Sequence, residues 1–115
     1  MKTRPSVVIA GLLAFALAGP AMGDKLEDGK DLYREHCKSC HDMDSEHGAY
    51  MPMDLIQDQW RRFFDRKYER THKDVLDNAH GGKPVTETIT PEQLELIKNF
   101  AIEGAADSEH PMTCG

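Results

Sequence analysis

The chain has 115 residues, of which 20 are acidic and 14 basic, giving a formal net charge of −6 at pH 7. This length allows one small domain with a marginal core, which a buried cofactor would stabilise. The acidic balance argues against a nucleic-acid-binding protein. Three cysteines are an odd number and do not form the pattern of a disulfide-rich exported domain.

The first segment predicts a secretory signal peptide. Lys2 and Arg4 form a basic start, residues 7–18 are apolar, and small residues end the segment at Gly23. The apolar run is shorter than the roughly 20 residues that a membrane-spanning helix needs. We therefore expect cleavage near Gly23, leaving residues 24–115 as the exported domain without stable membrane insertion. A retained anchor is the alternative.

The first helix is predicted over residues 26–37, because Gly29, Tyr33 and His36 recur at helical steps. It ends at two closely spaced cysteines and a histidine, which are described below, and a short polar loop over residues 42–48 follows. No pattern typical of a strand is present anywhere in the chain, so an all-α domain is expected.

The motif Cys37-Lys38-Ser39-Cys40-His41 is a C-x-x-C-H. Two thiols at this spacing can bond two vinyl groups along one haem edge, and the adjacent His41 then reaches the iron. A redox dithiol would need strands around the motif, and a zinc site would need a second ligand pair at similar spacing. The motif therefore predicts one haem c, bound covalently through Cys37 and Cys40 and ligated by His41.

Two middle helices are predicted next. One spans residues 55–70, and another begins at Thr71, where Asp74 completes a variant of the capping box. The second of these ends at the Gly81-Gly82 pair. The apolar ridge of the first comprises Trp60, Phe63 and Phe64, and the inward side of the second comprises Val75, Leu76 and Ala79.

The last helix has the clearest signals. Thr90 can cap it, Pro91 suits the first helical position, and Gln93 completes a capping box. The helix is expected to end at Gly104, and residues 105–115 to form an irregular tail. Its apolar stripe comprises Leu94, Ile97 and Ala101, with Phe100 beside it.

This order of elements resembles class I cytochrome c, over residues 24–103. The resemblance implies an all-α fold in which the N- and C-terminal helices cross around one covalently bound haem. In that family, a glycine and an aromatic residue on the first helix cross an aromatic residue on the last. Gly29, Tyr33 and Phe100 match these roles, and glycine allows the two backbones to approach closely.

The resemblance also assigns a role to Pro52, whose carbonyl would hold the second ring nitrogen of His41 and so orient the ligand. More narrowly, the chain is similar to the small periplasmic monohaem cytochromes of bacteria that oxidise or reduce extracellular iron. That narrower similarity rests on the middle helix and the tail.

The sixth haem ligand departs from the family pattern. The usual methionine lies in the loop before the last helix, where this chain has none and His80 takes its place. We predict His41 and His80 as the axial pair, with a lower potential than that of His/Met relatives. Met112, Met53 and Met51 remain alternatives, as does an open site.

The other histidines receive different expectations. His110 lies in the tail, from which it could fold back onto the iron. His72 is expected in a solvated helix cap, and His36 and His47 on the surface.

These features predict a periplasmic protein that carries single electrons on its haem between redox partners. No nucleophile or general base accompanies the motif, so no enzymatic activity is expected. The alternative is a haem-based sensor or small-ligand-binding protein whose sixth ligand can be displaced, and a peroxidase-like enzyme is a third reading. Rapid carbon monoxide binding would favour either alternative.

A cluster of basic side chains suggests where partners dock. The expected partners are other redox proteins, multihaem cytochromes among them, and the chain is expected to be a monomer. The same cluster can equally be the solvated face of a helix. The basic residues are Arg61, Arg62, Arg66, Lys67, Arg70 and Lys73.

Cys114 can be a free thiol, an intermolecular disulfide or an incidental residue.

Overall fold

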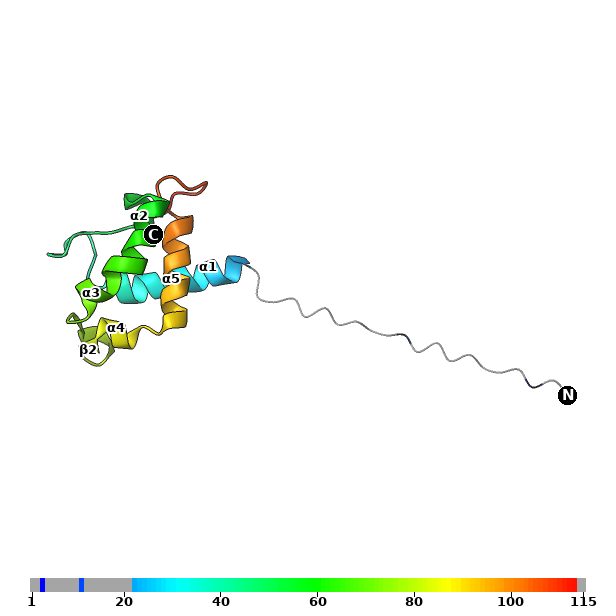
Figure 1. Ribbon diagram of the computed structural model, residues 1–115, viewed down its shortest axis with the longest axis horizontal. Helices are drawn as coiled ribbons and strands as arrows, with labels where there is room; N and C mark the ends of the chain where they lie inside the picture. Colours follow the sequence, from blue (N-terminus) through cyan, green and yellow to red (C-terminus); the bar gives the residue numbers. More distant parts are fainter. Residues whose placement is uncertain (1–2, 4–10, 12–21, 114–115) are drawn as a thin grey trace.

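The structure is a computed structural model that describes residue 3, residue 11 and residues 22–113 (Figure 1). The predicted signal sequence therefore lies almost entirely outside the described residues, and so does Cys114. None of the helices in the described part is both long enough and apolar enough to cross a membrane.

The first and last helices cross, as the family resemblance implies (Figure 1). Helix α1 (Met22–Leu32) continues as the wider π-helical turn η1 (Tyr33–Lys38), and α5 spans Pro91–Glu103. A Cβ atom on Gly29 would collide with the carbonyl oxygen of Leu96 and lie 2.9 Å from Cβ of Phe100. The rings of Tyr33 and Phe100 meet edge to face at 5.6 Å. The crossing therefore depends on the missing side chain of Gly29.

The middle of the chain forms one helical run. A short 3₁₀ turn, η2 (Pro52–Asp54), precedes α2 (Gln57–Arg62), which continues through the π-helical turn η3 (Phe63–Lys67) into α3 (Tyr68–His72). The helix predicted over residues 55–70 is thus present with shifted ends. The separate helix predicted from Thr71 is wrong, because the Thr71 hydroxyl donates to the Lys67 carbonyl at 2.7 Å inside α3.

Two short strands follow, although no strand was expected. Strand β1 (Leu76–Asp77) pairs antiparallel with β2 (Lys83–Pro84), with Leu76 opposite Pro84. The 3₁₀ turn η4 (Asn78–His80) and a glycine pair with φ of 100° and 75° connect them. Leu76 is 53% exposed and is not part of the buried core, although it lines a cavity described below.

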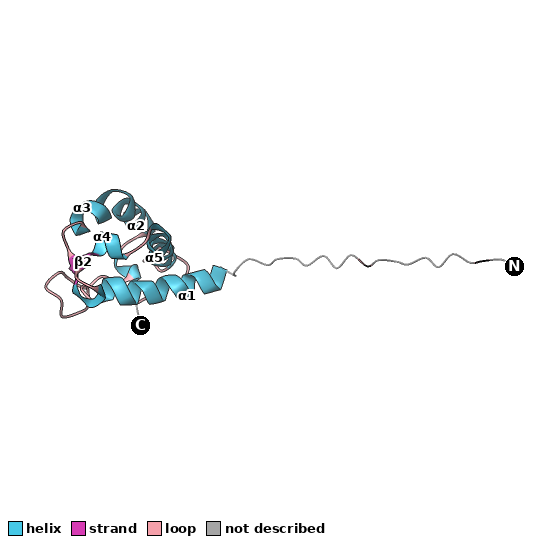
Figure 2. Ribbon diagram, turned by 90° about the horizontal axis from the view of Figure 1, so that it is seen from below, coloured by secondary structure: helices cyan, strands magenta, loops and turns pink. Residues whose placement is uncertain are grey.

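Helix α4 (Val85–Thr88) leads into α5, whose predicted cap is confirmed: the Thr90 hydroxyl accepts from the backbone N–H of Gln93. Gly104 ends α5, also as predicted. Figure 2 shows α1 along one side of the molecule, α2 and α3 on the other, and α4 and α5 between them. The buried core between them comprises Tyr33, Trp60, Val85, Ile89, Ile97, Phe100, Ala101 and Ala105.

Candidate functional site

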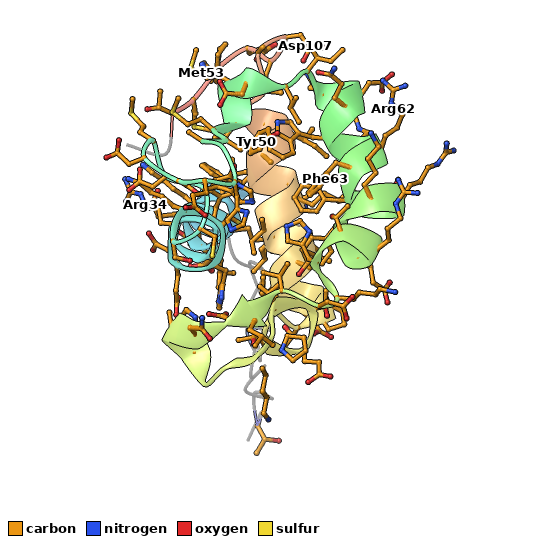
Figure 3. The ribbon with its side chains drawn as sticks, turned by 90° about the vertical axis from the view of Figure 1, so that its left-hand side faces the viewer. Arg34, Tyr50, Met53, Arg62, Phe63 and Asp107 are labelled. Atoms are coloured by element: carbon orange, nitrogen blue, oxygen red, sulfur yellow. The ribbon has the colours of Figure 1, made fainter. Side chains whose placement is uncertain are left out.

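A cavity of about 950 Å³ lies between the C-x-x-C-H motif and the helical run of residues 57–72. This volume lies at the upper end of the range of about 300–1,000 Å³ that is typical of small-molecule and cofactor sites. Figure 3 shows Phe63 and Tyr50, both cavity residues, between the end of α1 and the α2–α3 run. The apolar wall includes Leu55, Trp60, Phe63, Phe64, Val85, Ile89, Leu94 and Ile97.

The predicted thioether cysteines lie together in the cavity wall. The backbone N–H groups of Cys40 and His41 both donate to the Cys37 carbonyl, at 3.2 and 2.9 Å. This single turn gives all three residues access to the same cavity. Cys37 is half-buried and Cys40 is exposed, so one edge of a group bonded to both thiols would border solvent.

The hydrogen bond of His41 defines which ring nitrogen can bind a metal. Its Nδ1 lies 2.8 Å from the Gly48 carbonyl oxygen. A carbonyl oxygen can only accept, so Nδ1 carries the proton and Nε2 of the neutral ring keeps its lone pair. This is the ligand-ready tautomer that the motif requires.

The role expected for Pro52 does not agree with this geometry. Gly48, not Pro52, supplies the carbonyl on His41. The Pro52 carbonyl accepts instead from Nε1 of buried Trp60 at 2.8 Å. A buried indole N–H needs an acceptor, and Pro52 provides it.

His72 lies in the wall of the same cavity, where no role was predicted for it. It is half-buried rather than solvated. Its Nδ1 lies 2.9 Å from the Tyr68 carbonyl, so Nδ1 donates and Nε2 of the neutral ring again keeps the lone pair. Burial lowers the pKa of His72, the bond to the Tyr68 carbonyl raises it, and neighbouring His41 lowers it, with a net decrease that favours the neutral ring.

The spacing of His41 and His72 suits one metal ion between them. Their ring centres are 6.3 Å apart. With metal–nitrogen bonds of about 2.0 Å, two imidazoles on opposite sides of one ion have ring centres roughly 6 Å apart. The two histidines therefore form a pair that could hold a haem iron from both faces.

His80, the predicted sixth ligand, is not among the residues that line the cavity. Its Nδ1 lies 2.8 Å from Oδ1 of Asp77 and its Nε2 lies 3.0 Å from Oε1 of Glu35. Hydrogen bonding to Asp77 raises the pKa of His80, and Glu35 adds to the effect. Both ring nitrogens of His80 face carboxylates outside the cavity wall, so the structure disagrees with the axial pair predicted from the sequence.

The methionine alternatives also lie elsewhere. No methionine is among the residues that line the cavity in the described part of the chain. The backbone N–H of Met53 donates to the Met112 carbonyl at 3.1 Å, and Met112 N–H donates to Gly104 at 2.9 Å. These bonds hold the tail against the end of α5, and Figure 3 shows Met53 at the edge of the molecule near Asp107.

Polar groups in the wall fit the two carboxylates that a haem carries. The hydroxyl of Tyr68 is buried and has no hydrogen-bond partner among the described residues. Burial above all, with smaller effects of Cys37 and Glu69, raises the pKa of Tyr68 to about 12, so the phenol keeps its proton and can donate. Basic side chains can pair with carboxylates, and those in the wall are Arg62, Arg66, Lys67 and Arg70.

The chain matches a known protein family. The protein-family model described as Cytochrome c matches residues 26–100, a segment that runs from α1 to the buried Phe100 of α5 and includes the whole motif. No solved structure matches the chain.

Proposed function

Because the chain belongs to the cytochrome c family, we propose that it is a periplasmic one-electron carrier with a single haem c, attached at Cys37 and Cys40 and ligated by His41 and His72. Members of this family are typically electron carriers, and the family implies a covalently bound haem. When bound, the haem iron supplies one-electron redox chemistry. The finer parts of the proposal rest on the residues of this chain.

The observation that carries the proposal is the geometry of the two cavity histidines. His41 and His72 each fix Nδ1 on a backbone carbonyl and leave Nε2 unprotonated, with ring centres 6.3 Å apart. Two nitrogen ligands stabilise ferric iron more than a nitrogen and a thioether do, so the potential is lower than in His/Met relatives. A site occupied on both faces favours electron transfer over ligand binding.

Different residues of the cavity wall have different proposed roles. Exposed Cys40 places one edge of the bound group near solvent, where a partner can exchange electrons. The apolar residues around Trp60 would exclude water, the Tyr68 hydroxyl could donate a hydrogen bond to a haem carboxylate, and the neighbouring basic side chains could neutralise its charge.

The location and partners are proposed from the sequence. The basic, apolar and small-residue pattern of residues 1–23 supports export to the periplasm. The basic residues between Arg61 and Lys73 support docking of redox proteins with acidic surfaces, such as multihaem cytochromes. A narrower relation to cytochromes that exchange electrons with extracellular iron remains part of the proposal.

The decisive experiment is optical and low-temperature EPR spectroscopy of the purified ferric protein, with carbon monoxide added to the reduced form. We expect low-spin signals, no long-wavelength sulfur-to-iron band, and slow or absent carbon monoxide binding. A sulfur band would overturn the His72 assignment in favour of a methionine. A high-spin signal with rapid carbon monoxide binding would support the sensor instead.

Two variants distinguish the histidines. His72→Ala should give a high-spin ferric haem and a reduced form that binds carbon monoxide at once. His80→Ala should keep the low-spin spectrum, because His80 lies outside the cavity wall. The opposite result would restore His80 as the axial ligand.

A further inference from the structure

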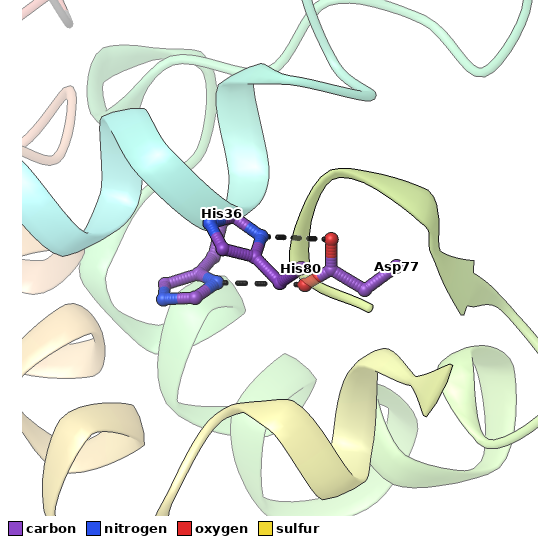
Figure 4. A group of neighbouring side chains, drawn as sticks. All are labelled: His36, Asp77 and His80. Atoms are coloured by element: carbon purple, nitrogen blue, oxygen red, sulfur yellow. Dashed lines mark hydrogen bonds and ion pairs between the residues drawn. The ribbon is translucent and has the colours of Figure 1, made fainter. Parts of the chain in front are cut away.

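A second cluster of metal-binding side chains lies beside the cavity and takes no part in the proposed haem ligation. It comprises His36 at the end of α1–η1, Asp77 of β1 and His80 of η4 (Figure 4). One ligand atom from each residue lies within 4.8 Å of the other two. Segments far apart in the sequence thus bring two imidazoles and one carboxylate to a single point.

Two atoms of this cluster are buried without a hydrogen-bond partner. His36 Nδ1 and Asp77 Oδ2 are both in this state within the described part of the chain, and their side chains are only 6% and 7% exposed. They lie 3.7 Å apart, beyond hydrogen-bond distance. A buried polar atom without a partner costs about 1–3 kcal/mol of stability. A ligand that bonds to both atoms would therefore stabilise this part of the fold.

A divalent cation would satisfy both atoms. In a tetrahedral zinc site, bonds of about 2.0–2.1 Å place neighbouring ligand atoms roughly 3.4 Å apart. Oδ2 of Asp77 lies 3.7 Å from His36 Nδ1, and Oδ1 lies 2.8 Å from His80 Nδ1 in a hydrogen bond that a metal would replace. Small side-chain movements would therefore complete the geometry.

Glu35 supplies the support that ligating histidines commonly have. Its Oε1 lies 3.0 Å from His80 Nε2. With Nε2 donating to Glu35, Nδ1 of His80 is the nitrogen left for a metal, as in the carboxylate–histidine–metal arrangements of known sites. The two carboxylates together balance the charge of a divalent ion.

We propose that His36, Asp77 and His80 bind one divalent transition-metal cation of the zinc type, with Glu35 orienting His80. The donor set of two imidazoles and one carboxylate, with an open fourth position, is one that zinc accepts. The site is distinct from the haem ligands, and it is not assigned by the resemblance to the cytochrome c family.

The position of the cation has a consequence that rests on the proposed function. His36 directly precedes Cys37, and His36 and Asp77 both line the haem cavity. A positive ion at the wall of this cavity would favour the reduced state of a haem bound there, in which the iron carries less charge. Metal binding should therefore raise the haem midpoint potential.

The test is isothermal titration calorimetry of the purified holoprotein with zinc chloride, in a Cys114→Ser background so that no tail thiol competes. We expect saturation at one zinc per chain. His80→Ala and Asp77→Asn should abolish the binding, and His110→Ala, which removes an exposed histidine of the tail, should leave it intact. No binding, or binding that persists in both cluster variants, would overturn the proposal.

The haem spectrum of each sample, recorded without zinc, separates this inference from the proposed function. A normal low-spin spectrum with no zinc binding defeats the metal site alone. A high-spin spectrum with intact zinc binding defeats the axial pair alone. Redox titration should then show a higher potential with zinc in the parent protein and no change in His80→Ala, and an unchanged parent potential would remove the coupling.

Discussion

At the scale of single residues, one buried hydrogen bond joins the motif side of the molecule to the helical run. Trp60 is 4% exposed, and its Nε1 donates to the Pro52 carbonyl at 2.8 Å. Trp60→Phe keeps an aromatic ring but removes the donor and leaves a small void. We expect a loss of about 1–3 kcal/mol in the free energy of unfolding, measured by urea denaturation with circular dichroism. Glu95→Ala, on the exposed side of α5, is the surface control.

Residue-level prediction is most direct where chemistry is local and fails where it depends on the course of a helix. Cys37, Cys40 and His41 could be assigned because their spacing matches the haem edge itself. The sequence did not predict that His72 lines the cavity, because the predicted helix ends at Arg70. Trp60, Phe64, Tyr68 and His72 recur every four residues and share one helical side, and following that spacing two residues further would have placed His72 on the cavity side.

At the scale of elements, the crossing of α1 and α5 is sensitive to one atom. A methyl group at Gly29 would meet the Leu96 carbonyl and the Phe100 side chain, both within helix α5. Gly29→Ala should therefore lower the free energy of unfolding by about 1–3 kcal/mol or more, despite the better helix propensity of alanine. Asp28→Ala, at the neighbouring exposed position, should change it little. Equal stability of the two variants in urea denaturation would show that the helices can separate without cost.

Removing the cap of α5 should lower the free energy of unfolding by a smaller amount, and a serine at this position should restore it. Thr90 Oγ1 accepts from Gln93 N–H at 3.2 Å, and Gln93 Oε1 accepts from Thr90 N–H at 3.0 Å. Thr90→Ala should cost about 1 kcal/mol of the free energy of unfolding. Thr90→Ser should restore most of it, because serine keeps the accepting oxygen. Thermal unfolding of the three proteins checks both expectations, and no recovery with serine would assign the loss to packing of the methyl group.

The elements that the sequence misplaced are those with little local signal. Thr71 and Asp74 match a capping pattern, but the apolar side of α2–α3 extends to His72 and holds Thr71 inside the helix. Strands β1 and β2 contain two residues each, which is too short for an alternation of polar and apolar side chains. Their pairing depends on the turn at Gly81 and Gly82, where the sequence suggested only the end of a helix.

At the scale of the whole molecule, charge is unevenly distributed. The sequence carries a net charge of −6, but six basic residues and only two acidic ones lie between residues 61 and 73. Four of the six line the cavity, so the basic cluster borders the proposed haem site. The overall charge and the local charge therefore predict opposite responses to an anionic reagent.

The salt dependence of oxidation by ferricyanide distinguishes these two responses. In this reaction the ferrous protein gives one electron to ferricyanide, which becomes ferrocyanide. If the basic cluster guides the anion, the rate measured by stopped flow should fall as ionic strength rises. If net charge dominates, the rate should rise instead.

The double variant Arg61→Glu/Lys73→Glu, at exposed positions outside the cavity wall, should slow the reaction at low salt. Lys25→Glu/Lys83→Glu changes the total charge equally but lies outside the basic cluster, so it should slow the reaction less. Equal effects of the two pairs would show that the cluster has no steering role, and that docking depends on contacts at the exposed edge near Cys40.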